Sequence, residues 1–103
     1  MEFVAFLRFR PSVSAADRDA ALMRRAAWKY PDGITVLSEY WPMSGECQVV
    51  TAFAADSITA MMEVEFEWND VFDISIHPAI SADDGLRVGP DVFARLPRMQ
   101  HSG

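Results

Sequence analysis

The sequence contains a single cysteine, Cys47, and few basic residues. One cysteine cannot form an intramolecular disulfide, and no Cys/His spacing matches a zinc site, so a disulfide-stapled or zinc-stabilised fold is excluded. Lys and Arg number nine against fifteen Asp and Glu, which gives a formal net charge of −6. Because nucleic acids bind to basic surfaces, this balance argues against a nucleic-acid partner.

Long apolar runs and glycine-rich loops are also missing from the sequence. No stretch approaches the about 20 apolar residues that a membrane helix needs. Glu2 lies where a signal peptide needs positive charge, and Arg8 interrupts the first apolar run. We therefore expect no membrane partner and a cytoplasmic protein. The five glycines are scattered and form no phosphate loop, and we expect no cofactor.

Hydrophobic residues make up half of the 103 residues, which excludes a disordered chain and fits one domain. Apolar alternation predicts strands, and the 3.6-residue period predicts helices. The expected strands cover residues 2–10, 34–41, 46–54 and 72–78, with 42–45 as a turn. The expected helices run from Ser14 to about Tyr30, and from Asp56 or Ser57 to about Asp70.

This β-α-β-β-α-β order is the ferredoxin-like arrangement, an α+β fold with two helices on one face of a four-stranded antiparallel sheet. We expect this domain at residues 1–80, followed by an extension at 81–103. The extension is predicted to break at Gly89-Pro90, to form a short helix from Pro90, and to end in a frayed tail from Gln100.

The face of the sheet without helices is predicted to be apolar too. Val4 and Phe6 lie on it, and both faces of the second and third strands carry large apolar groups. A solvated face should instead be polar. The simplest cover is the same sheet of a second copy, so we expect a homodimer that forms an α+β barrel.

The first helix is predicted to turn its basic residues, Arg18, Arg25 and Lys29, to solvent. The apolar stripe is formed by Leu22, Met23, Ala26 and Tyr30. Trp28 falls outside that stripe, so it is either exposed or used against a partner.

Three short motifs suggest a family. They are the run Trp-Lys-Tyr-Pro-Asp-Gly-Ile-Thr-Val-Leu at 28–37, Trp41, and Trp68-Asn69-Asp70 leading into residues 72–78. Over about residues 2–80 the chain resembles the DUF3303-type domain of the dimeric α+β barrel superfamily. The resemblance implies the fold and the dimer, but no settled activity. In that family a His often follows the strand-two Trp, where this chain has Pro42.

Glu65 is the first candidate for chemistry. Helical spacing places it on the side of the second helix that also carries Ile58, Met61, Met62, Trp68 and Asn69. A carboxylate among apolar side chains has a raised pKa, which suits a general acid or base. In the alternative interpretation the helix is rotated slightly, and Glu65 lies at the rim in solvent.

His77 is the second candidate, on a strand face that it shares with Asp73 and Ser75. Residues two apart on a strand are about 6–7 Å apart, too far for a catalytic triad. The imidazole could serve as proton shuttle or ligand, or simply bond to a neighbour at the strand end. Arg8 could anchor an anion or form an edge ion pair. Tyr40 and Trp41 are predicted to face opposite sides of their strand.

These candidates predict a small-molecule-binding dimer with a pocket between the second helix and the sheet. The ligand would be apolar or aromatic, and by fold analogy the protein could be a cofactor-independent monooxygenase- or cyclase-like enzyme. Glu65 and His77 are the expected catalytic residues. The expected substrate-binding residues are Arg8, Tyr40, Trp41, Met62, Trp68 and Asn69.

Two alternatives stay open: a non-catalytic binding or regulatory dimer, and a haem- or metal-binding protein that uses His77. A cavity shared by Glu65 and His77 would favour catalysis. An exposed Glu65 together with a barrel interior filled by side chains would favour the non-catalytic dimer.

Overall fold

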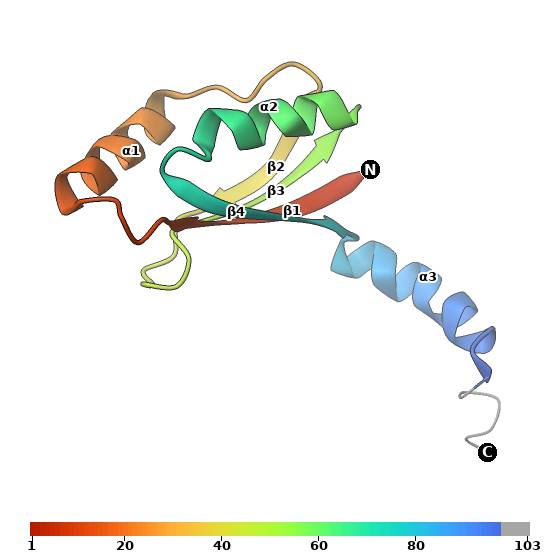
Figure 1. Cartoon of the computed structure of the whole chain (residues 1–103). Coiled ribbons are helices and arrows are strands. Elements are labelled where there is room, and N and C mark those ends of the chain that lie inside the picture. Colours follow the sequence, from red (N-terminus) through yellow and green to blue (C-terminus); the bar gives the residue numbers. More distant parts are fainter. Residues whose placement is uncertain (98–103) are drawn as a thin grey trace.

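The computed structural model describes residues 1–97 as a four-stranded antiparallel sheet with three helices (Figure 1). The strands are β1 (Glu2–Phe9), β2 (Ile34–Tyr40), β3 (Val49–Ala55) and β4 (Phe72–Ala79). The helices are α1 (Ala15–Ala27), α2 (Ile58–Trp68) and α3 (Ala82–Ala94). The α+β ferredoxin-like fold predicted from the sequence is confirmed. The predicted frayed tail from Gln100 lies outside the described residues.

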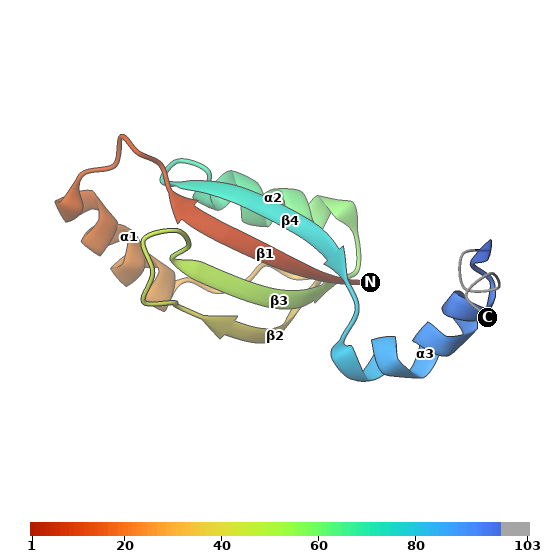
Figure 2. The same ribbon diagram turned by 90° about the horizontal axis from the view of Figure 1, so that it is seen from below.

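The strand order is β2-β3-β1-β4, so β1 and β3 occupy the centre of the sheet. Helices α1 and α2 cover one face (Figure 1). The opposite face, called here the open face, is bare when viewed from below (Figure 2). Residues 41–48 join β2 to β3, a longer connection than the predicted turn, because β3 begins three residues later than expected.

The core lies between the sheet and the two covering helices. Leu7, Val49, Phe53 and Phe72 are completely buried there, and Trp68 of α2 is almost completely buried. The Phe72 ring stacks on that of Phe9 at 4.8 Å between centroids. Burying a large apolar side chain contributes about 1.5–3 kcal/mol, so this layer holds α2 against the sheet.

Two serines fix where the covering helices begin. Ser14 and Ser57 cap α1 and α2, since each side chain accepts a hydrogen bond from the backbone N–H three residues later. The connection into β2 turns at Gly33, which has a φ of 88°. The Gly33 carbonyl accepts a hydrogen bond from the Asp56 N–H at 2.9 Å, which ties this turn to the start of α2.

Both covering helices are rotated relative to the sequence prediction. Helix α1 buries Ala21 and Arg25, whereas Met23 is 73% exposed. Helix α2 buries Ala60, Val64 and Trp68, and turns Glu65 outward. The predicted faces were therefore right only in part: Leu22, Met61 and Trp68 pack against the core as predicted. Apolar side chains occur on nearly every side of α2, so its spacing alone does not select the buried face.

Helix α3 is much longer than predicted, because it begins at Ala82 and continues through Gly89-Pro90. The Ser81 side chain caps it by accepting a hydrogen bond from the Asp84 N–H at 3.1 Å. Asp83 and Asp84 lie in the first turn, where negative charge interacts favourably with the helix dipole. These start signals offset part of the cost of Pro90, which removes one backbone hydrogen bond. The helix projects away from the sheet (Figure 1).

Candidate functional site

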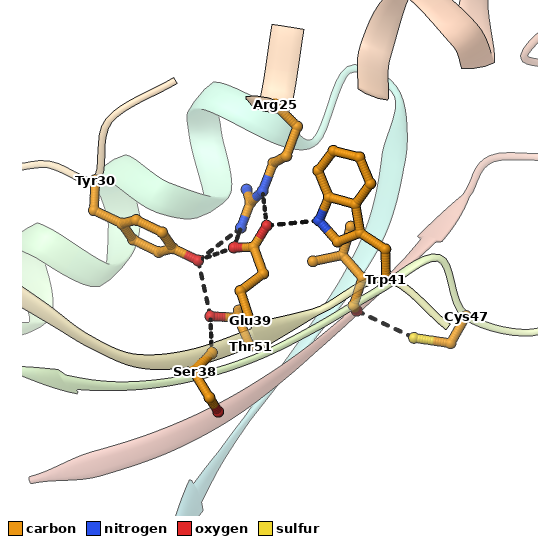
Figure 3. Close-up of polar contacts among 8 residues, drawn as sticks. Arg25, Tyr30, Ser38, Glu39, Trp41, Cys47 and Thr51 are labelled. Carbon is orange, nitrogen blue, oxygen red and sulfur yellow. Dashed lines mark hydrogen bonds and ion pairs between the residues drawn. The ribbon is translucent and has the colours of Figure 1, made fainter. Parts of the chain in front are cut away.

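A buried polar cluster lies between α1 and the β2–β3 hairpin (Figure 3). Its centre is an ion pair in which the Arg25 Nη2 atom lies 2.8 Å from Glu39 Oε1 and Nε lies 3.2 Å from Oε2. This two-point contact is the strongest geometry for a guanidinium and a carboxylate. The Arg25 side chain is 1% exposed and that of Glu39 is 21% exposed, so the guanidinium is shielded from water and the carboxylate is partly so.

Tyr30 and Trp41 complete the shell around Glu39 (Figure 3). The Tyr30 hydroxyl donates to Glu39, accepts from Arg25 Nη2 at 2.9 Å, and lies 2.8 Å from the Thr51 hydroxyl. The Trp41 indole N–H donates to Glu39 at 2.8 Å. Burial and the bond to Glu39 raise the pKa of Tyr30 to about 12.

Glu39 is subject to opposing effects. Burial favours its neutral form, but the hydrogen bonds from Arg25, Trp41 and Tyr30 outweigh this and hold the pKa of Glu39 below its usual value. The carboxylate is therefore ionised and fully paired, as expected of a structural group. A free base ready to accept a proton would need an unpaired oxygen lone pair.

Aromatic rings enclose the guanidinium of Arg25. Its carbon lies 4.6 Å from the Trp28 ring centroid and 5.0 Å from that of Trp68. Trp28 packs edge-on against Trp68 and donates its indole N–H to Glu67. Trp28 was predicted to be either exposed or used against a partner. Neither prediction fits, because Trp28 packs against residues of its own chain. Arg25 Nη1 and Trp68 Nε1 are buried without a hydrogen-bond partner among the described residues.

The sequence prediction placed Arg25 in solvent and did not single out Glu39. The irregularity between Val36 and Ser38 in the β2–β3 register explains the second omission. Strict alternation would put Glu39 on the face opposite Val36, but the β-bulge shifts the strand by one residue and turns Glu39 inward beside Thr51. An acidic residue inside a β-branched, aromatic strand was the available signal.

A groove lies between α2 and the helix-covered side of β4. It has a volume of about 350 Å³ and is lined by Ile58, Met61, Met62, Glu65, Ile74 and Ile76. A second hollow of about 280 Å³ at the start of α2 shares Ile58 and Met61 with it, and also involves Met1 and Phe3. The two hollows adjoin, and together they reach the size range of small-molecule sites.

Of the predicted site residues, this groove brings together only Met62 and Glu65. Glu65 is exposed at the rim, so the desolvation expected from the sequence is absent. Trp68 packs in the core under α2. Asn69 is the C-cap of α2, and its backbone N–H donates to the Glu65 carbonyl at 2.8 Å.

The remaining predicted site residues lie elsewhere. His77 pairs with Val4 across the strands and its ring is 6.0 Å from that of Phe6, so it belongs to the open face. Arg8 lines a separate hollow of about 260 Å³ with Phe6, Cys47 and Asp73. The carboxylate of Asp73 forms its ion pair with Arg10, at 3.8 Å.

Glu65 and His77 therefore lie on opposite sides of the sheet, and none of the cavities described above includes both. Tyr40 pairs with Val50 on the open face, whereas Trp41 turns to the Glu39 cluster, so the two do face opposite sides. Residues 1–97 contain no group of three or more His, Cys, Asp or Glu side chains that could hold a metal ion.

Within residues 1–97, no helix has the length and apolar character to cross a membrane.

Comparison with protein families gives one match, to the model described as Domain of unknown function (DUF3303), over residues 1–93. The chain belongs to the DUF3303 family. No curated protein and no solved structure matches it.

The resemblance predicted from the aromatic motifs is thus confirmed, and the match continues through most of α3. In this DUF3303 chain, Trp28 and Trp68 enclose Arg25, and Trp41 bonds to its partner Glu39. Three residues of the motifs that suggested the family therefore hold one buried ion pair.

Proposed function

We propose that this DUF3303 protein binds a small apolar or aromatic molecule in the groove between α2 and β4. The observation that carries the proposal is the adjoining pair of hollows that share Ile58 and Met61. Met side chains adapt their shape to a ligand, since they are unbranched and polarizable. A groove of this kind gains its affinity from apolar burial.

The charge of the groove narrows the class of ligand. Glu65 lies at one end and Asp56 lines the other hollow, so the charged side chains of both hollows are acidic. An anionic ligand would be repelled, whereas a neutral or amine-bearing aromatic molecule would find an acceptor. We therefore propose a neutral or cationic aromatic ligand.

Non-catalytic binding fits the geometry better than catalysis. A shared cavity of Glu65 and His77 would support an acid–base enzyme, but the two side chains lie on opposite faces of the sheet. The exposed Glu65 supports the binding alternative. The catalytic roles of both residues stay predictions, as does the monooxygenase- or cyclase-like activity, and as does a cytoplasmic location.

We further propose that the protein is a homodimer that packs its open faces together. The centre of that face carries Val4, Phe6, Val50 and Ala52, which pair with one another across β1 and β3. Phe6 remains exposed there although it is a large aromatic residue. A sheet face with apolar side chains at its centre is typical of a surface that another sheet covers.

The binding proposal is tested with the neutral fluorescent probe N-phenyl-1-naphthylamine. Ile58 is 73% exposed and lines both hollows, so Ile58→Arg places a charge at their junction without disturbing the core. We expect this variant to weaken probe binding about tenfold, the effect of losing about 1.4 kcal/mol.

Met23→Arg is the matched control, because Met23 is equally exposed on α1 and lines none of the cavities described above. Its probe affinity should equal that of the unmodified chain. Equal affinities of the Ile58 and Met23 variants, or no binding by the unmodified chain, would overturn the proposed site.

A further inference from the structure

The last helix, α3, stands apart from the domain that precedes it. None of its side chains is buried, and Leu86 is 78% and Phe93 49% exposed. Yet α3 is amphipathic. Its apolar side is formed by Gly85, Leu86, Gly89, Val92 and Phe93, and its other side carries Asp83, Asp84, Arg87 and Asp91. A surface helix with such a stripe normally packs it against something.

A helix of this kind does not hold together by itself. It has 13 residues, and isolated helices of that length are marginal in water. Gly85 and Gly89 each lower helix stability by about 1 kcal/mol relative to alanine, and Pro90 by about 3 kcal/mol. The N-cap at Ser81 offsets only part of this. α3 therefore needs a surface that its own domain does not provide.

The shape of the described residues points the same way. Helix α3 continues beyond the end of the sheet and away from α1 and α2, so neither covering helix packs on its apolar side (Figures 1 and 2).

We propose that α3 is an exchange arm that packs its apolar side on a second copy of the chain. It leaves β4 toward the side of the sheet that α1 and α2 do not cover (Figure 1). Two sheets that pack face to face lie about 10 Å apart. A 13-residue helix is about 20 Å long, so α3 must run alongside the partner once the open faces meet.

The residues that lead into α3 continue the apolar surface of the open face. A hollow of about 230 Å³ there is lined by Val4, Leu37, Ala52 and Ile80, together with neighbouring residues. One interface would thus cover both the sheet and α3. The arm rests on the dimer proposed above, but it adds a contact that the sheets alone do not make.

The mass of the full chain in solution tests the arm, by light scattering across a dilution series. We expect the unmodified chain to be a dimer. Each of the single variants Leu86→Asp and Phe93→Asp should raise the dissociation constant of that dimer at least tenfold. Asp91→Asn is the control, because it also changes the charge by one unit, but on the polar side of the same helix. It should leave the constant unchanged.

The outcomes separate the arm from the dimer. A monomeric unmodified chain would overturn both proposals. A dimer that Leu86→Asp and Phe93→Asp leave as tight as before would overturn the arm alone.

Hydrogen exchange on the unmodified chain provides a measurement without substitution. The amides of residues 86–89 and 91–94 should exchange slowly at protein concentrations above the dissociation constant and rapidly below it, because α3 is stable only against the partner. Fast exchange of these amides in the dimer would contradict the arm even if a variant failed to fold.

Discussion

The buried cation of Arg25 is held by a small number of well-placed groups. Its charge is balanced by Glu39, its guanidinium lies close to the rings of Trp28 and Trp68, and Tyr30 bonds to both ends of the ion pair. Removing two ions from water is costly, and good geometry with extra hydrogen bonds is what compensates. We therefore regard this cluster as the structural centre of the helix-covered side.

Glu39→Gln tests that view. It leaves the Arg25 charge buried without a counter-ion, so we expect the free energy of unfolding to fall by about 3 kcal/mol in urea titrations. Asp70→Asn is the matched control, since Asp70 pairs with Arg24 at an exposed site and should cost less than about 1 kcal/mol. Equal losses in the free energy of unfolding for the two variants would contradict the structural role of the cluster.

The hydroxyl of Tyr30 gives a pH-dependent signature. Its folded pKa of about 12 lies above the unfolded value of about 10. The stability that it contributes is therefore complete below pH about 10 and is lost as the pH rises through about 12. Tyrosinate absorbance should show a step near pH 12 that Tyr30→Phe removes. Removal of that step by Tyr40→Phe would contradict the assignment.

Among the elements, β2 and α2 decide where the two sites form. The β-bulge after Val36 turns Glu39 toward Arg25, and the capped start of α2 sets the rim of the groove. The turn before β2 links them, because Gly33 contacts the first turn of α2. Its φ of 88° is a left-handed conformation that glycine adopts without strain.

Gly33→Ala should therefore destabilise the protein. The new methyl group would lie 3.3 Å from the Ala60 Cβ atom and would have to adopt the left-handed conformation. We expect a loss of about 1–2 kcal/mol in the free energy of unfolding. Gly45→Ala is the control, because an added Cβ there meets no atom within 4 Å. An equally stable Gly33→Ala variant would show that the turn can relax.

In the molecule as a whole, the open face and α3 are two parts of one unsatisfied surface. The sheet carries apolar side chains on both faces, and the helices cover only one of them (Figure 2). The described residues form a flat sheet-and-helix body from which α3 projects, a shape that a lone small domain does not favour (Figure 1). The predicted dimer and its exchange arm belong to this level, since both concern surfaces that the single chain leaves uncovered.

The local features of the chain followed directly from its residues. Alternation and turn residues predicted the four strands, because these signals depend on neighbours along the chain. The cap residues predicted the starts of α1 at Ser14 and of α2 at Asp56 or Ser57, and the structure selects Ser57. The family followed from the aromatic motifs for the same reason. Helix α3 was predicted only from Pro90 onward, because Gly89-Pro90 was taken as a break, and the cap at Ser81 was missed.

The buried faces and the sites depended on contacts between distant segments. Arg25 was predicted to be in solvent because its partner, Glu39, lies on another element and turns inward only through a bulge. Glu65 and His77 were separated because consecutive strand residues point to opposite faces and α2 covers only one of them. Periodicity shows that a helix or strand has an apolar side, but only packing selects which side chains are buried.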